Sequence, residues 1–565
     1  MSKSYHDWLA FEGLDEALKK ELEAMDEKEI AESFSVPLTF GTGGIRGVLG
    51  AGTSKLNVYT VKKVLFGYAR YLMKNNLDQG IVIAHDNRHF SRTFAELASA
   101  VLAHFSIKSY LFESLRPTPV LSFSVRHLNA SGGIMITASH NPPEYNGLKL
   151  YDALGGQLVP HQAEAVIAEI DAIDDLFALD AIDVENALQS EWVEMIGDAV
   201  DEAYLSAVLD LAPDHTSKHL KIGFTPEHGT AHYLGPELLK RAGFEVYQEP
   251  KQSMVDPDFS ATKSANPENK EAFEALETVG IQKGLDLLIA TDPDADRIGL
   301  SVLHEGTYHT LNGNQTGVLM LDYLMRRREK NQTMPKKPVV FSTIVSTDMA
   351  EKMAKRNQMS YVKTLTGFKY IGEQMELIQE TDFTFFFGFE ESYGYIVEDI
   401  TRDKDALQAT LIASLMAEEA KQEGKTLIDR LNALYEEYGV YIEDLENIGL
   451  KGIAGRKKID AIMAFFRDYT PRSFIKKNLI VKEDFLTSIA TNTQDTWTLN
   501  YPSDNVIKFS FKDFWFVLRP SGTEPKLKIY FMVKKPTKEE AQSTLNALKK
   551  EVLSIVDKIL ESESS

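Results

Sequence analysis

Short apolar runs alternate with longer amphipathic segments along most of this 565-residue chain. The runs at 81–84, 134–138 and 287–290 are mainly aliphatic, and their length predicts buried strands. The segment 58–75 carries apolar and charged residues at helical spacing and predicts a helix. Strands that alternate with helices are typical of α/β units built around a mostly parallel sheet.

The same alternation predicts most of the remaining elements. Further strands are expected at 109–112, 220–224, 244–246, 339–342 and 383–389. Further helices are expected from near Thr93, with Ser91 as the cap, and at 233–242, 317–329 and 405–422. Residues 1–40 predict a charged surface helix, and the acidic stretch that follows Tyr151 predicts helical structure as far as about Ala207.

The chain is too long for one hydrophobic core, so several domains are expected. Three similar α/β units follow one another, which suggests an internal triplication, and from about Asp444 the pattern becomes α+β. We expect domain I at 1–207, domain II at 208–312, domain III at 313–443 and domain IV at 444–565.

Composition narrows the function classes. The net charge of −22 argues against a nucleic-acid partner, because such proteins need a basic face. The absence of cysteine excludes disulfides, thiolate catalysis and cysteine-bound zinc. Neither a signal peptide nor an apolar stretch of about 18 residues occurs, so we expect a cytoplasmic protein with no membrane partner. An anionic substrate would need a local cluster of cations or a metal.

The run at 134–138 leads into Ser139, His140, Asn141 and two prolines. The prolines stop any helix or ladder, which leaves Ser139 on a stiff loop at the end of a strand. We expect Ser139 to carry a phosphoryl group. His140 is able to pass protons, although a lone histidine is more often structural. A nucleophile elbow is excluded, because Thr137 and Asn141 stand in its glycine positions.

Asp292, Asp294 and Asp296 follow the buried run at 287–290. Three carboxylates at this spacing can turn toward one centre, where a hard divalent cation relieves their repulsion. A calcium EF-hand is excluded, because Arg297 and Leu303 occupy its glycine and bidentate-acid positions. Two alternatives stay open, an aspartyl-phosphate enzyme with Asp292 as nucleophile and a solvated acidic turn. Arg297 beside the triad suits a phosphate ligand.

Two further loops suit anions. The loop from Arg519 to Pro525 joins two apolar strands and offers a guanidinium, two hydroxyls and a glycine backbone, which fits a phosphate that is held. The glycine-rich stretch 40–47 contains Arg46 and fits a phosphate less specifically. A dinucleotide-binding fingerprint fails there, because its last glycine is Arg46 and no strand precedes it. Ordinary turns are the alternative for both loops.

Two acidic stretches complete the candidates. Gly388 to Gly394 places Glu390, Glu391 and Ser392 after a phenylalanine-rich strand, where carboxylates commonly accept hydrogen bonds from sugar hydroxyls. The stretch 402–405 reads Arg-Asp-Lys-Asp, which is by itself typical of a solvated helix start.

Taken together, the four loops at Ser139, Asp292, Glu390 and Arg519 resemble those of the α-D-phosphohexomutase superfamily, within its phosphoglucomutase/phosphomannomutase branch. The resemblance covers nearly the whole chain and keeps the order of the motifs. It implies an α/β fold of four domains around a central cleft, with three related mixed-sheet units and a C-terminal α+β domain.

The resemblance also implies a mechanism. Phosphorylated Ser139 gives its phosphoryl group to the 6-hydroxyl of glucose 1-phosphate, glucose 1,6-bisphosphate turns over, and its 1-phosphoryl returns to Ser139. Mg²⁺ on Asp292, Asp294, Asp296 and a phosphoserine oxygen neutralises charge. The implied catalytic groups are Ser139, His140, Lys149 and Lys404. The implied substrate-binding residues are Arg46, Arg297, Thr366, Glu390, Ser392, Arg519, Ser521, Gly522 and Thr523.

One position departs from the family pattern. Some bacterial phosphomannomutase/phosphoglucomutases carry a histidine two residues after the sugar-loop serine, where this chain has Gly394. The proton carrier among His140, Lys149 and Lys404 stays open. So does the sugar, since a phosphomannomutase or phosphopentomutase would use the same residues. A phosphatase and a non-catalytic sensor of sugar phosphates are the other classes. Small-molecule sugar phosphates are the expected partners, and the chain is expected to be a monomer or a dimer.

Overall fold

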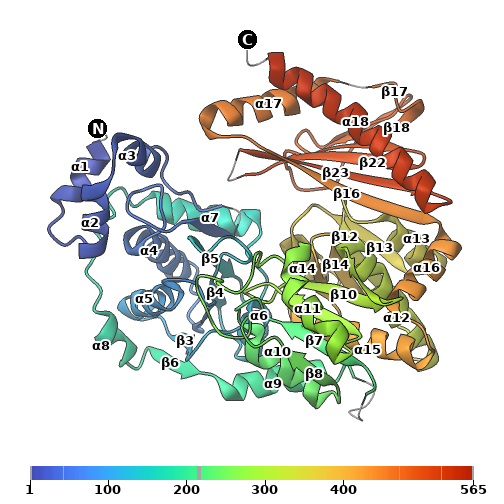
Figure 1. The fold of residues 1–565 in the computed structure, drawn as a ribbon. Helices are drawn as coiled ribbons and strands as arrows, with labels where there is room; N and C mark the ends of the chain where they lie inside the picture. The colour runs from blue at the N-terminus through green and yellow to red at the C-terminus, as the bar shows by residue number, and fades with distance from the viewer. Residues whose placement is uncertain (1–2, 42, 213–217, 470, 523–524, 563–565) are drawn as a thin grey trace. The chain divides into compact units, whose positions relative to one another are not determined.

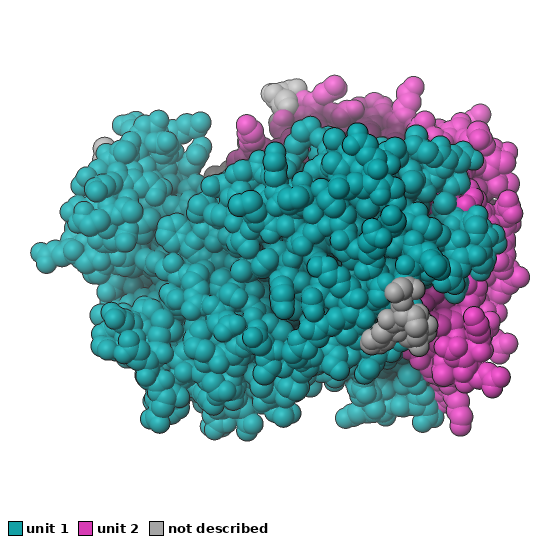
Figure 2. All heavy atoms as spheres, turned by 60° about the horizontal axis from the view of Figure 1, so that its bottom comes forward, with its two compact units in different colours: residues 1–316, 368–427 teal, residues 317–367, 428–565 magenta. Residues whose placement is uncertain are grey.

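The computed structural model describes residues 3–41, 43–212, 218–469, 471–522 and 525–562. The chain divides into two compact units, which Figure 2 colours separately. The first unit comprises 1–316 and 368–427, and the second comprises 317–367 and 428–565. Each unit is described by itself below.

The first unit contains a six-stranded mixed sheet that carries the Ser139 loop (Figure 1). In spatial order its strands are β1 (Gly44–Val48), β5 (Tyr145–Tyr151), β4 (Gly132–Ile136), β2 (Ile81–His85), β3 (Ser109–Phe112) and β6 (Val193–Ile196). Strands β4, β2, β3 and β6 are parallel, and β5 pairs antiparallel with both β1 and β4. Because β2 and β4 run in parallel, their carboxyl ends meet at one edge of the sheet.

Helices cover both faces of this sheet. The helices are α4 (Val58–Lys74), α5 (Ser91–His104), α6 (Thr118–His127), α7 (Pro160–Asp171), α8 (Val184–Leu188) and α9 (Asp198–Leu209). Helices α4, α5 and α7 bury an aliphatic core against Ile81, Ile83 and Ile134 on one face. Helix α6 packs on the other face, where Leu121 and Val125 lie against Gly133. The short helices α1 (Lys3–Ala10), α2 (Glu16–Ala24) and α3 (Glu27–Phe34) enclose a separate small core.

A second mixed sheet of the first unit carries the aspartate triad. Its order is β11 (Thr307–Leu311), β10 (Ile298–His304), β9 (Leu287–Thr291), β7 (Lys221–Thr225) and β8 (Glu245–Gln248). Strands β8, β7 and β9 are parallel, and β10 and β11 are antiparallel. The helices of this part are α10 (Ala231–Arg241), η1 (Lys270–Phe273), α11 (Glu274–Lys283) and α15 (Ala406–Gln422). The hairpin of β14 (Thr384–Glu390) and β15 (Gly394–Ile396) and helix α14 (Phe368–Leu377) also belong to this unit.

The second unit joins a parallel pair of strands to an antiparallel sheet. The pair is β12 (Pro338–Thr343) and β13 (Ser360–Thr364), with helix α13 (Asp348–Arg356) between them. The antiparallel strands, in order, are β16 (Val440–Gly449), β23 (Lys526–Lys535), β22 (Phe514–Pro520), β21 (Ile507–Phe511), β18 (Lys477–Asp484), β19 (Ile489–Thr491) and β20 (Thr496–Thr498), with β17 (Ser473–Phe474) beside β18.

Helices α17 (Gly452–Asp468) and α18 (Lys538–Ser562) pack on one face of the antiparallel sheet (Figure 1). Phe466 of α17 contacts Phe509 and Phe516 there. Side chains alternate across a strand, so Lys508 and Trp515 point to the opposite face, toward β12 and α13. The bounds of the remaining helices are α12 (Gly313–Lys330) and α16 (Leu427–Tyr438).

Several sequence expectations need correction. Residues 44–47 of the predicted glycine-rich loop lie in strand β1, and strand β5 at 145–151 was not predicted, because each strand finds a pairing partner that the local sequence does not show. The acidic stretch after Tyr151 contains strand β6 as well as helices. Residues 1–40 form three short helices around the buried Trp8.

Ser91 is not the cap of a later helix. It is the first residue of α5, preceded by Phe90 in left-handed conformation, and its hydroxyl donates to Asp86 instead.

Within the described residues, no helix combines the length and apolar character needed to cross a membrane.

Candidate active site

Ser139 lies on the loop that follows β4 and is almost completely buried. Its φ of 52° is in the left-handed region, which a residue with a side chain adopts only at a cost. Its backbone N–H donates to the Thr137 hydroxyl over 2.8 Å, which fixes the turn. The Oγ donates to Asp292 Oδ2 over 2.7 Å and lies 3.1 Å from Nδ1 of His140. The loop therefore aims the serine oxygen directly at the aspartate triad.

Arg88, which the sequence did not single out, fixes the backbone of the Ser139 loop. Its Nη2 donates to the carbonyl oxygens of Ser139 over 2.7 Å and of Asn141, and its Nη1 donates to those of Pro142 and Tyr145 over 2.7 and 2.9 Å. A planar guanidinium presents its donors in a fixed fork, so these contacts hold the loop in one conformation.

Arg88 is itself held in place by its surroundings. Its Nε lies 3.2 Å from Oδ2 of Asp86, and its guanidinium stacks 5.0 Å from the centre of the Phe259 ring. The parallel register of β2 and β4 places His85 opposite Ile136, so the loops after both strands meet. This parallel pairing is the signal that could have identified Arg88, because the sequence places charged residues directly after β2.

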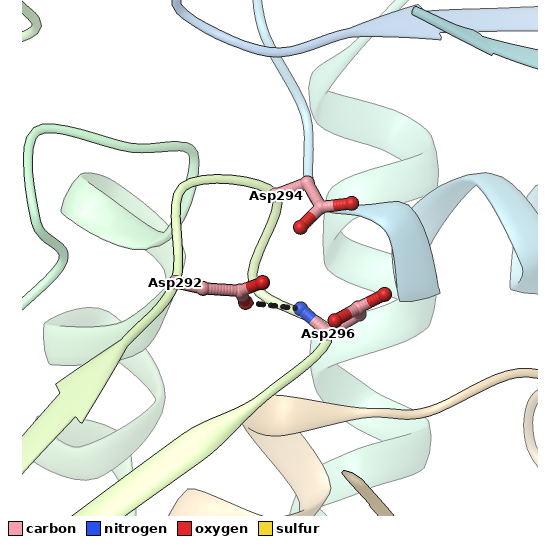
Figure 3. A group of neighbouring side chains, drawn as sticks. All are labelled: Asp292, Asp294 and Asp296. Atoms are coloured by element: carbon pink, nitrogen blue, oxygen red, sulfur yellow. Dashed lines mark hydrogen bonds between the residues drawn. The ribbon is translucent and has the colours of Figure 1, made fainter. Parts of the chain in front are cut away.

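Strand β9 delivers Asp292, Asp294 and Asp296 to one point, where their carboxylates turn toward one another (Figure 3). All three are buried, and one oxygen of each lies within 4.8 Å of the others. Asp292 Oδ1 accepts from the backbone N–H groups of Asp296 over 3.0 Å and Arg297 over 2.9 Å, which closes the loop. The sequence expectation that the three carboxylates converge is met, and the solvated acidic turn is excluded.

The triad fits a divalent cation. Among the described residues, Oδ1 of Asp294 and Oδ1 of Asp296 are buried and find no hydrogen-bond donor. Burial raises the pKa of Asp292 well above its ordinary value, and the charges of Asp294 and Asp296 add to the rise. Buried carboxylate oxygens that lack donors are costly unless a cation binds them. These oxygens are therefore suited to hold a divalent metal ion with hard oxygen ligands.

Two lysines face the other side of the triad. Lys149 Nζ lies 2.9 Å from Asp294 Oδ2 and 3.4 Å from Asp296 Oδ2, and Lys404 Nζ lies 3.1 Å from Asp296 Oδ2. Burial opposes the charge on each lysine. The carboxylates of Asp294 and Asp296 outweigh it at Lys149, and those of Asp296 and Asp403 at Lys404, so both pKa values lie above the ordinary value. Both side chains are therefore ammonium groups here.

Thr118 is a second residue that the sequence did not single out. Its hydroxyl donates to Asp294 Oδ2 over 3.0 Å, and its backbone N–H donates to the Asp294 carbonyl over 2.8 Å. It begins helix α6, so the first sheet and its helices hold this aspartate from the side opposite β9.

Pro293 is held by close packing against Gly229, where an added Cβ would lie 2.3 Å from Pro293 Cα.

The stretch 402–405 is buried, which corrects the expectation of a solvated helix start. Arg402 pairs with Glu376 and Asp399, and Asp405 caps helix α15 by accepting from the N–H groups of Leu407 and Gln408. This burial carries Lys404 into the site.

Gly394 makes room for Lys404. A Cβ at position 394 would lie 2.2 Å from Cδ of Lys404, so any larger residue would displace the lysine. The departure from the family pattern at this position therefore has a steric reason. Gly394 also bridges to Arg297, and the Ile298 N–H donates to the Tyr393 carbonyl over 3.1 Å. The β14–β15 hairpin thus lies directly against the loop that carries the aspartate triad.

The remaining predicted residues of the first unit lie around this centre. Glu390 ends β14 and is buried, and Ser392 is half-buried in the turn that follows. Arg46 projects from β1, and its Nη1 donates to Asn141 Oδ1 over 2.9 Å. Arg297 Nη1 lies 2.6 Å from Glu268 Oε1, an ion pair that the sequence did not indicate.

Other predicted residues belong to the second unit. Thr366 follows β13, and Arg519 is the penultimate residue of β22, where its Nε lies 3.9 Å from Asp504 Oδ2. Ser521 closes the turn between β22 and β23 through its N–H bond of 2.7 Å to the Lys526 carbonyl, and Gly522 beside it is exposed. Thr523 lies outside the described residues.

Comparison with known proteins identifies the family. Models of the phosphoglucomutase/phosphomannomutase family match most of the chain, as alpha/beta/alpha domains I, II and III at residues 37–176, 202–305 and 312–438 and the C-terminal domain at 475–550. A phosphoglucomutase of Staphylococcus aureus (strain MRSA252) is 37% identical over 539 residues, which cover 94% of this chain and 96% of that relative.

Solved structures agree on the fold. A putative phosphomannomutase from Thermus thermophilus superposes with a TM-score of 0.68 at 24% identity, over 92% of this chain and 99% of that one. The phosphoglucomutase parafusin from Paramecium, in its open form, gives a TM-score of 0.65 at 17% identity, over 93% and 96% of the chains. The four matched domains and the 37% identity to the S. aureus relative show that the chain belongs to the phosphoglucomutase/phosphomannomutase family of phosphohexomutases.

Proposed function

We propose that this protein is a phosphoglucomutase that interconverts α-D-glucose 1-phosphate and glucose 6-phosphate through phosphorylated Ser139. The observation that carries the proposal is the bond of 2.7 Å between Ser139 Oγ and Asp292 Oδ2 inside a buried carboxylate triad. A serine oxygen held against a metal site is suited to receive and return a phosphoryl group. The S. aureus relative named phosphoglucomutase, aligned over nearly the whole chain, supports the same activity.

The proposed reaction conserves the phosphoryl group. Phosphorylated Ser139 gives its phosphoryl to the 6-hydroxyl of glucose 1-phosphate, which loses its proton to a base of the site. The glucose 1,6-bisphosphate formed reverses its orientation, and its 1-phosphoryl bonds to the Ser139 oxygen as the bond to the sugar 1-oxygen breaks. That sugar oxygen takes up a proton from the protonated base. Glucose 6-phosphate leaves, and the enzyme is again phosphorylated.

We propose Mg²⁺ as the metal, held by Asp292, Asp294 and Asp296 and by the phosphate on Ser139. Its preference for carboxylates together with a substrate phosphate supports this choice. When bound, the ion supplies positive charge that neutralises the transferring group. Lys149 and Lys404 add fixed positive charge beside Asp294 and Asp296. Arg88 and Thr118 keep the serine loop and Asp294 in place.

Three groups are proposed for proton transfer. His140 Nδ1 lies 3.1 Å from Ser139 Oγ, whereas Lys149 and Lys404 contact the triad. Of the three, His140 alone is within hydrogen-bond distance of the serine oxygen. Because the raised pKa values keep Lys149 and Lys404 as ammonium groups, the lysines are proposed as proton donors and His140 as the proton acceptor. Kinetic measurements on variants of these three residues distinguish their roles, because removal of the base lowers turnover more than it lowers substrate affinity.

Recognition of the sugar phosphate is assigned to the remaining predicted residues. Glu390 is proposed to accept hydrogen bonds from sugar hydroxyls, because a carboxylate can accept from two hydroxyls at once, and Ser392 is proposed to donate a hydrogen bond to a sugar hydroxyl. The phosphate that is not transferred is assigned to the loop that contains Arg519, Ser521, Gly522 and Thr523. Arg297 is proposed as a phosphate ligand beside the triad, and Arg46 and Thr366 are proposed as further substrate-binding residues.

A coupled assay tests the substrate. Purified protein would be supplied in turn with glucose 1-phosphate, mannose 1-phosphate and ribose 1-phosphate, with Mg²⁺ and a trace of glucose 1,6-bisphosphate. The proposal expects the highest kcat/KM on glucose 1-phosphate. Negligible activity on that sugar with high activity on either of the others would reassign the enzyme to phosphomannose or phosphopentose, and release of free phosphate at the rate of sugar consumption would make it a phosphatase.

A further inference from the structure

The second unit contains a cavity of about 360 Å³ that shares no residue with the candidate active site. Helix α13 and strand β13 line one side, and strands β18, β21 and β22 line the other. Half of its lining residues are charged, and aromatic side chains that include Tyr441, Tyr501 and Trp515 form part of the wall. A cavity of this size is in the range of small-molecule sites.

Lys508 is a buried cation in the wall of this cavity, only 6% exposed. Its Nζ donates to the Ile344 carbonyl over 2.6 Å and lies 4.6 Å from the centre of the Trp515 ring. Among the residues that the structure describes, no carboxylate lies within ion-pair distance of it. Burial, with the positive charge of Lys363 added, lowers the pKa of Lys508 to about 8. A buried lysine usually has an anionic partner, so this one is unusual.

Three of the four carboxylates that line the cavity are engaged with lysines other than Lys508. Asp348 and Glu351 bind Lys363 over 2.7 and 2.6 Å, and Asp348 also accepts from Trp515 Nε1 over 3.0 Å. Asp513 lies 3.3 Å from Lys535.

The lining as a whole is balanced in charge. Its four lysines are Lys363, Lys508, Lys512 and Lys534, and its four carboxylates are Asp348, Glu351, Glu483 and Asp513. Within this lining, Lys508 is buried against the Trp515 ring and has no ion pair among the described residues.

We propose that this cavity binds a small organic anion, with its phosphate or carboxylate group on Lys508 and its carbon skeleton against Tyr441, Tyr501 and Trp515. The anion supplies the counter-charge that Lys508 lacks, and the volume admits a metabolite of a few carbons. The site differs in residues and in chemistry from the metal-centred site of the first unit. The inference does not depend on the proposed mutase activity.

Titration calorimetry of the full-length protein tests the proposal. Citrate represents a carboxylate ligand and glycerol 3-phosphate a phosphate ligand, and each is titrated into the wild type, Lys508→Met and Lys477→Met. Lys477 is exposed on β18 and lines no part of the cavity, so its variant is the matched control. We expect at least one anion to bind about tenfold more weakly to Lys508→Met than to the other two proteins. The anion that loses affinity identifies the source of the ligand charge.

The same titrations are repeated at a series of pH values. Protonated Lys508 attracts the anion, so binding is expected to weaken between about pH 7 and about pH 9.5, across the pKa of that lysine. The groups that face Lys508 are Asp348 and Glu351 of α13, Lys363 of β13, Glu483 of β18 and Trp515 of β22. Their variants are not needed, because Lys508→Met removes the pH-dependent part directly.

Chemical labelling gives a readout that needs no variant. Acetic anhydride is applied to the wild type with and without each anion, and modification of Lys508 and Lys477 is measured by peptide mass spectrometry. The proposal expects the anion to slow modification of Lys508 and to leave Lys477 unchanged. Equal affinities in wild type and Lys508→Met for both anions, or equal labelling of Lys508 with and without them, would overturn it.

Discussion

The guanidinium of Arg88 donates a hydrogen bond of 2.7 Å to the backbone carbonyl of Ser139. Three more loop carbonyls accept from the same side chain, so Arg88 holds the backbone that carries the serine oxygen. We therefore expect the chemistry of the site to depend on this one buried side chain, which follows the neighbouring strand.

Replacement of Arg88 by lysine tests this dependence. An ammonium group cannot reproduce the planar fork, so the Ser139 loop loses part of its support. We expect kcat to fall by about tenfold to a hundredfold with KM little changed, because a small displacement of the reacting atom is costly. Steady-state kinetics measure the split. The matched control is Arg92→Lys, since Arg92 makes a partly exposed pair with Glu96. Wild-type kcat in Arg88→Lys would contradict the assigned role.

Thr118→Val tests the support of the metal site. Valine keeps the shape of threonine but removes the donor to Asp294 Oδ2. Loss of such a supporting bond typically weakens metal binding by about 10–100-fold, and we expect a loss in that range. The activation constant for Mg²⁺ and the rise in melting temperature with Mg²⁺ are the measurements. Thr118→Ser keeps the hydroxyl and is expected to bind as the wild type does, so equal weakening in both variants would count against the hydrogen bond as the cause.

Gly394→Ala tests whether the position of the Lys404 side chain matters for turnover. The added Cβ would lie 2.2 Å from Lys404 Cδ, so the lysine must leave its position beside Asp296. We expect turnover to fall by at least about tenfold, since a fixed charge leaves the site. Gly449→Ala is the control, because a Cβ there meets nothing within 4 Å. Unchanged turnover in Gly394→Ala would show that Lys404 does not act from this position.

Glu227 predicts a dependence of stability on pH. Burial raises the pKa of this carboxyl to about 8, so the folded protein holds a proton that the unfolded chain releases near the ordinary value. Between those two values the folded state binds more protons, and stability therefore falls as pH rises. Glu227→Gln is expected to match the wild type near pH 4 and to be more stable near pH 8, by on the order of a few kcal/mol. Urea denaturation at both pH values measures this, and a constant difference between them would contradict it.

The sequence predicts the strands and loops that carry the site better than it predicts the residues that hold those loops in place. Buried aliphatic runs predict strands β2, β4 and β9 because residues of that type fill a sheet covered on both faces. The loop after β4 then carries Ser139, and the loop after β9 carries the triad. Both motifs could be located because their side chains carry the chemistry themselves.

The supporting residues could not be found in this way. Arg88 and Thr118 act through contacts of 2.7 and 3.0 Å to residues far away in the sequence, and these contacts depend on strand register and helix placement. The buried stretch 402–405 has the composition of a surface, and only its ion pairs show why it is inside. Strand β5 was missed for a similar reason, since polar and apolar residues mix along it and its partners lie elsewhere in the chain.

The phosphorylated serine is the central claim, and the mass of the intact protein tests it most directly. The protein is measured before and after incubation with glucose 1,6-bisphosphate and Mg²⁺, and the modified peptide is sequenced. The account predicts an added mass of about 80 Da on Ser139, which is absent in an otherwise folded Ser139→Ala variant that has no turnover. An unmodified Ser139 after the incubation, or the same mass on Asp292, would contradict it.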